Sequence, residues 1–148
     1  MPPKYHKTSE TDFETFKKSV IFWRSYFKIG TWEVGFEHND SHPDNRATCC
    51  AELGARHVTF VLTKSKWAYK VTEAELRLLG FHEVVELLLM RLQTYACERN
   101  PVGDLNDIVH EIVHVLENSV FRMVEANFDC ESTKLDNNKQ TVNNRIFQ

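Results

Sequence analysis

Two short segments of the chain place histidine and glutamate at spacings that suit a metal ion. Residues 82–86 read His-Glu-Val-Val-Glu, and residues 110–114 read His-Glu-Ile-Val-His. Side chains four positions apart leave the same face of a helix, so the first and last residues of either segment could bind one ion. The glutamate in second place lies beside that face, where it can take a proton from a metal-bound water. The chemistry that these residues suggest is metal-assisted hydrolysis.

The position of the first segment in the chain favours it as the core of the site. In metallopeptidases the signature helix directly follows the sheet, and a later helix supplies a further ligand. His82 and Glu86 follow the predicted strands directly, which favours this pair over His110 and His114 as the core of a metal site. The second segment matches the peptidase signature in its letters, but a string of five residues often arises by chance in helices.

Three residues of the later helix compete for the remaining ligand position: His110, His114 and Glu117. They lie on one stripe of that helix, because they are three and four positions apart. An antiparallel hairpin centred near residue 102 would set Glu86 opposite Glu117 and Leu89 opposite His114, within about one helical turn. Polar groups that face each other between helices must satisfy one another or share an ion. A polar network without metal is therefore the alternative to a zinc site.

The apolar pattern predicts the elements that come before this hairpin. A stripe of aromatic and aliphatic residues indicates a helix that begins at Thr11, with Glu14 completing a capping box, and ends at a left-handed Gly30. Alternating and short apolar runs then predict three strands, of which the last two form a hairpin through Gly54. The predicted strands are residues 32–36, 47–53 and 57–62.

The helical hairpin has clear start and stop signals. Thr72 and Glu75 form a second capping box, which begins a helix that runs to about Arg99, and Pro101 prevents its continuation. A further helix runs from about Asp104 to residue 128. The order of elements predicts an α+β fold with an N-terminal helix, a small three-stranded, mainly antiparallel sheet and a long helical hairpin.

The bulk properties indicate one ordinary globular domain. The 148 residues are 42% hydrophobic and 26% charged, which suits a single domain over residues 11–128, with a flexible leader over 1–10 and a polar tail over 129–148. The net charge of −3 gives no basic field for nucleic acid. No apolar run is long enough to span a bilayer, and we expect neither a membrane nor a nucleic acid as partner. The four cysteines lack metal-binding spacing and are expected to be free thiols of the cytoplasm.

Residues 64–70 interleave basic and aromatic side chains between the last strand and the hairpin. Such a mixture can bind nucleic acid, but the chain as a whole is acidic. We therefore expect this connector to line a substrate cleft or to pack as a short fourth strand. Trp67 and Tyr69 are its aromatic members.

The sequence also resembles a known family. Residues 81–89, together with His110 and residues 116–118, resemble small phage-encoded metallopeptidases, and the lead-in at 32–36 is similar as well. The resemblance covers about residues 13–122. It implies a minimal zincin-like fold.

The resemblance also implies roles for individual residues. His82 and Glu86 would be zinc ligands, Glu83 the base that activates water, and His110 the best match for the further ligand. Glu86 departs from the histidine that usually holds its position. The expected function is a zinc-dependent peptidase acting on peptide or protein in a bacterial cytoplasm. The rival expectation is a non-catalytic module on the same fold that binds a host protein.

Overall fold

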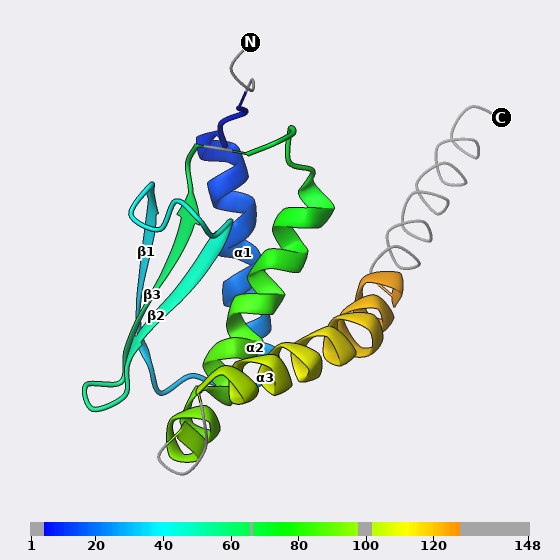
Figure 1. Ribbon diagram of the computed structural model, residues 1–148. Coiled ribbons are helices and arrows are strands. Elements are labelled where there is room, and N and C mark those ends of the chain that lie inside the picture. Colours follow the sequence, from blue (N-terminus) through cyan, green and yellow to red (C-terminus); the bar gives the residue numbers. More distant parts are fainter. Residues whose placement is uncertain (1–4, 66, 98–101, 128–148) are drawn as a thin grey trace, which may run out of the picture. The chain divides into compact units, whose positions relative to one another are not determined.

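The computed structural model describes residues 5–65, 67–97 and 102–127 (Figure 1). The chain divides into two compact units, residues 1–113 and 114–148, and each is considered by itself. The predicted polar tail lies outside the described residues, as do residues 1–4 of the predicted leader. The rest of the leader pairs with the connector, since the amides of His6 and Thr8 donate to the carbonyls of Trp67 and Lys64.

Helix α1 (Glu10–Tyr26) begins earlier than the sequence predicts. Its capping box uses Ser9 and Asp12 rather than Thr11 and Glu14, because the Ser9 amide and the Asp12 carboxylate lie 2.7 Å apart. The predicted left-handed Gly30 is also wrong, since Lys28 takes the positive φ of 56° after the helix. The predicted apolar stripe is confirmed, and its buried members are Phe13, Phe16, Val20 and Trp23.

The three strands form a mixed sheet in the order β1-β3-β2. They are β1 (Glu33–Asn39), β2 (Ala47–Glu52) and β3 (His57–Thr63). The hairpin of β2 and β3 is antiparallel as predicted, whereas β1 pairs in parallel with β3, so "mainly antiparallel" does not describe this sheet. The physical reason is that β3, the most buried strand, takes the centre and pairs on both edges, which leaves β2 at an outer edge.

Helix α2 (Glu73–Cys97) begins at the predicted capping box of Thr72 and Glu75. Figure 1 shows α1 and α2 side by side against the sheet. The two helices approach closely at Gly80, where a Cβ atom would lie 2.6 Å from the Cβ and Oγ atoms of Ser19. The Trp23 and Phe81 rings meet edge to face at 4.7 Å, and this packing holds α2 in place.

The later helix is α3 (Val102–Leu116), followed by the π-helical turn η1 (Glu117–Phe121) and helical residues 122–127. The turn was not predicted. Its cause is local, because Asn118 and Ser119 donate their side chains to the carbonyls four residues earlier, at 2.9 and 2.7 Å. Of the helices in residues 5–65, 67–97 and 102–127, none has the length and apolar character needed to cross a bilayer.

Candidate metal centre

His82 and Glu86 form the part of the site that lies on α2. They are one helical turn apart, and the His82 Nε2 and Glu86 Oε1 atoms lie 3.2 Å from each other. Both side chains are mostly covered, with 21% and 29% of their surface exposed. Their contact holds the two ligand atoms close together, and their partial exposure leaves both side chains accessible from solvent.

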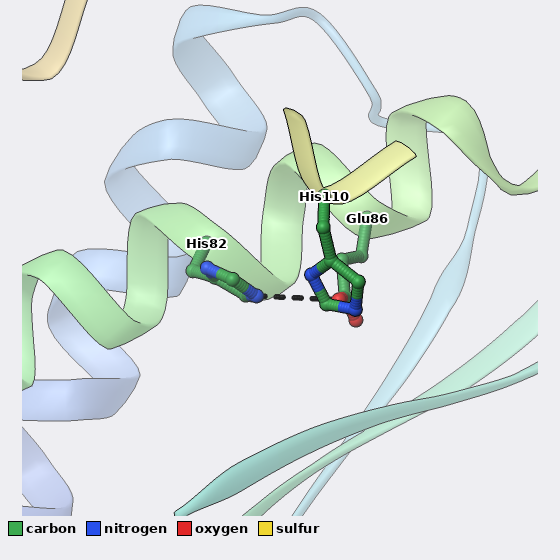
Figure 2. Close-up of side chains that lie close together, drawn as sticks. All are labelled: His82, Glu86 and His110. Carbon is green, nitrogen blue, oxygen red and sulfur yellow. Dashed lines mark hydrogen bonds and ion pairs between the residues drawn. The ribbon is translucent and has the colours of Figure 1, made fainter. Parts of the chain in front are cut away.

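His110 of α3 completes a group of three. One ligand atom from each of His82, Glu86 and His110 lies within 4.8 Å of the other two, so the group could hold a metal ion. The rings of His82 and His110 lie with their centroids 6.0 Å apart. Figure 2 shows the two α2 side chains and His110 converging on the same space.

The spacing of the three donor atoms fits a small metal ion after modest side-chain rotation. Zinc bound by histidine and carboxylate has bonds of about 2.0–2.2 Å, so tetrahedral ligand atoms lie roughly 3.3–3.5 Å apart. The contact between His82 and Glu86 already has this separation, and His110 is exposed and can turn. Two imidazole nitrogens and one carboxylate oxygen also form the three-ligand set that leaves one coordination position open.

Glu83 lies beside this group, under the cleft surface. It is only 3% exposed, and its Oε2 atom has no hydrogen-bond partner among the described residues. Burial, and to a smaller extent the negative charge of Glu86, raise the pKa of Glu83 to about 8 against the lowering effects of His82 and the Cys49 amide. An unpaired carboxylate oxygen in this place is costly unless it is protonated or faces a cation.

The open cleft above Glu83 is bounded by the outer strand of the sheet. Ala47 and Thr48 of β2 line it, and the backbone amide of Cys49, the next residue, donates to the Glu83 carboxylate. The other lining residues come from α2, α3 and the loop before β2: Asp44, Asn45, Arg46, Leu79, His82, Glu83, Glu86 and His110.

The two adjacent cysteines of β2 are free thiols, as predicted, and neither is activated as a nucleophile. Burial raises the pKa of the Cys49 thiol, and the charges of Glu83 and Glu86 raise it further. Burial likewise raises the pKa of Cys50, although its Sγ atom lies 3.5 Å from His42 Nε2. Cys97 and Cys130 fall where no side chain is described.

The other two predicted ligands belong to the second unit. His114 Nδ1 and Glu117 Oε2 form an ion pair with each other at 2.9 Å. The His114 side chain is 66% exposed and that of Glu117 is 13% exposed. In the part of the chain that the structure describes, the ligand group takes His110 from α3 and neither of these two.

The register of the helical hairpin explains why His110 joins the group. Gln93 and Asn106 are hydrogen-bonded, and the point halfway between them lies between residues 99 and 100. Glu86 and His110 are centred on residue 98. The predicted register assumed a centre near residue 102. A centre four residues earlier moves the position opposite Glu86 by eight residues, about two turns, from near residue 118 to His110.

Sequence reasoning missed the contribution of residues 44–48 to the cleft. The loop before β2 alternates His38, Asp40, His42 and Asp44, but its turn-forming residues are typical of any exposed loop, and a solvated loop was the expectation. The connector 64–70 was expected to line a cleft or to pack as a short strand, and none of its described residues lines this cleft. Its Trp67 and Tyr69 rings lie against Arg46, which is one of the cleft residues.

Comparison with known proteins gives no match: no protein-family model fits the chain, and no curated protein or solved structure is significantly similar to it.

Proposed function

We propose that the protein is a zinc-dependent hydrolase of the small metallopeptidase type, with His82, Glu86 and His110 as the zinc ligands. The observation that supports this most directly is the convergence of three metal-binding side chains from two helices within 4.8 Å. The unpaired Oε2 atom of Glu83 supports it independently, because a buried carboxylate next to three ligands suits a site that receives a cation.

Each side chain of the cleft has a role in this proposal. His82, Glu86 and His110 bind zinc, which supplies Lewis acidity and makes a water molecule acidic at neutral pH. Glu83 accepts the proton of the attacking water and passes it to the leaving amine. The Cys49 amide, which donates to the Glu83 carboxylate, fixes the orientation of this base.

The outer strand β2 suits a peptide as the substrate. Among the described residues β2 pairs with β3 and with no other strand, and its first two residues line the cleft. An extended peptide can pair with the backbone of an outer strand, and this would place one of its amide bonds over the ligand group. A peptide is therefore the substrate that we propose.

The experiment that tests the proposal is metal analysis of the purified full-length protein. After exposure to zinc and exhaustive dialysis, we expect one zinc per chain, retained by His57→Ala and lost by His110→Ala. His57 lies on β3 outside the cleft and is the matched histidine control. A wild-type protein without stoichiometric zinc contradicts the proposal. Cleavage of a casein digest, followed by mass spectrometry, should then be lost in Glu83→Gln while its zinc is retained.

One observation favours a second candidate, a non-catalytic module that binds a host protein. Glu83 is almost completely buried, and a base must reach the water that it activates. A zinc-loaded protein that cleaves none of the peptides in the digest, and in which Glu83→Gln changes only the stability, would select this candidate over the enzyme.

A further inference from the structure

Arg46 is the residue of the cleft that carries a permanent positive charge. It lies directly before β2, and its carbonyl accepts a hydrogen bond from the Thr63 amide at 3.0 Å, which fixes the backbone there. The acidic residues that line the same cleft with Arg46 are Asp44, Glu83 and Glu86. A cation at the rim of an otherwise acidic cleft is the natural partner for an anionic group of a ligand.

The Arg46 guanidinium lies against two aromatic rings of the connector. Its Cζ atom lies 5.6 Å from the Trp67 ring centroid and 5.2 Å from that of Tyr69, both within the range of cation–π contacts. Trp67 is 4% exposed and donates its indole N–H to the Thr63 carbonyl at 2.9 Å. The Tyr69 hydroxyl donates to Glu75 Oε1 at 2.7 Å. Both rings are therefore held in place before any ligand arrives.

These cation–π contacts use none of the N–H donors of the guanidinium in a hydrogen bond. Among the described residues the Arg46 side chain donates no hydrogen bond, so its planar fork of N–H donors is available to a ligand. Within residues 5–65, 67–97 and 102–127, no carboxylate forms an ion pair with Arg46. The nearest acidic influence is Glu75, whose carboxylate already accepts from Tyr69 and Thr72 and whose pKa is lowered mainly by the Thr72 amide, with Arg46 as the smallest contribution.

We propose that Arg46, held by Trp67 and Tyr69, binds a carboxylate of the peptide that occupies the cleft, so that the protein selects peptides that present a carboxylate at this position. The role in substrate selection rests on the proposed function, but the carboxylate site itself does not require zinc. The carboxylate comes either from an aspartate or glutamate side chain or from the peptide C-terminus, and both present the same two oxygens to the planar fork of arginine.

The test measures peptide affinity on the metal-free, full-length protein by NMR titration, followed at the Trp67 indole signal. The three probes are acetyl-Ala-Ala-Asp-Ala-Ala-amide, its Asn counterpart, and acetyl-pentaalanine with a free C-terminus. We expect one of the two carboxylate peptides to bind about tenfold more tightly than the Asn peptide, which is the usual gain of a charge-assisted hydrogen bond. Which of them it is distinguishes a side-chain carboxylate from a terminal one.

Variants assign this preference to Arg46. Arg46→Gln should abolish it, and Arg46→Lys should retain only part of it, because lysine keeps the charge without the planar fork. Arg56→Gln removes the same charge from the exposed turn between β2 and β3 and should retain the full preference. Thermal unfolding of each variant confirms that the fold is intact.

The outcomes separate this inference from the proposed function. Equal affinity for all three peptides, absence of binding up to about 10 mM, or a preference that persists in Arg46→Gln overturns the carboxylate site. A preference that depends on Arg46 in a protein that binds no zinc leaves the carboxylate site established and the zinc hydrolase rejected. Stoichiometric zinc without any carboxylate preference gives the reverse result.

Discussion

The segments 82–86 and 110–114 have nearly the same sequence, but they differ in burial and in the residues that surround them. The first has Glu83, Val84 and Val85 buried, and it belongs to α2, the helix that packs against α1 and the outer strand β2. In the second, Val113 alone is buried, and the other four side chains are exposed. His82 pairs with Glu86 inside its segment, whereas His114 pairs with Glu117 outside its own. The comparison teaches that burial and neighbours, more than the letters of a motif, decide which histidine can join a site.

The largest expected difference between the two segments is in zinc affinity. His82→Ala should weaken zinc binding by at least about a hundredfold, since it removes a proposed ligand and even partners of ligands are commonly worth 10–100-fold. His114→Ala should leave the affinity within about twofold, because this histidine is outside the ligand group. Competition with a chelator of known affinity measures both. Comparable losses in the two variants would contradict the separation of the segments.

The second residue of each segment, Glu83 or Glu111, should differ in its effect on the pH dependence of stability. In metal-free protein the raised pKa of Glu83, about 8, means that the folded state holds a proton that the unfolded chain releases near pH 4.5. Between these values the folded state binds more protons, so stability falls as pH rises, by an amount on the order of 2 kcal/mol or more. Glu83→Gln should remove this loss.

Glu111→Gln is the matched control for that measurement, since Glu111 holds the same place in the exposed segment. Urea unfolding in the presence of EDTA at pH 5, 6.5 and 8 gives the free energy of unfolding for each variant. A wild-type protein whose stability does not fall over this range, or a Glu111→Gln variant that behaves like Glu83→Gln, would show that Glu83 is not buried as a neutral acid.

Close packing of α2 should make its glycine difficult to replace. Gly80→Ala would place a Cβ atom 2.6 Å from Ser19 Cβ and Oγ and 3.1 Å from the Val20 amide nitrogen. Ser19 cannot move aside easily, because its hydroxyl donates to the Arg77 carbonyl at 2.7 Å. We expect a net loss of about 1–3 kcal/mol, despite the roughly 1 kcal/mol that alanine gains over glycine in a helix.

The control for the packing measurement is Gly30→Ala, where a Cβ atom would meet nothing within 4 Å. Thermal unfolding should place this variant within about 0.5 kcal/mol of the wild type. If Gly80→Ala is equally well tolerated, α2 is not held against α1 as tightly as the contact at Ser19 requires, and the first segment loses the rigid support that distinguishes it from the second.

Local signals predicted the features that local chemistry determines. The capping box of Thr72 and Glu75 begins α2 in the structure, and the buried stripe of α1 follows the predicted spacing. The α+β class follows from the order of these elements. His82 and Glu86 were predicted as a pair for the same reason, since four positions on one helix fix their separation.

Features that depend on pairing across the chain could not be predicted in this way. Nothing in residues 33–39 indicates that they pair in parallel with β3, because the alternation of a strand is the same in both directions. The choice of His110 depends on which residues of α2 and α3 meet, and an error of four residues in the assumed centre displaces the facing residue by eight, about two turns. The cleft role of Arg46 depends on contacts with Trp67 and Tyr69, more than twenty positions later in the chain.

The smallest expected effect on zinc binding comes from exchanging the residues that distinguish the two segments, Glu86 and His114. Glu86→His gives the first segment the full peptidase signature, and His114→Glu gives the second the spelling of the first. Since imidazole and carboxylate are both good zinc ligands, Glu86→His should retain one zinc per chain, with an affinity within about tenfold of the wild type. His114→Glu should change nothing in zinc binding. If His114→Glu instead lowers the zinc content while Glu86→His has no effect, the zinc site belongs to residues 110–114. The burial and neighbours of residues 82–86 would then not determine where zinc binds.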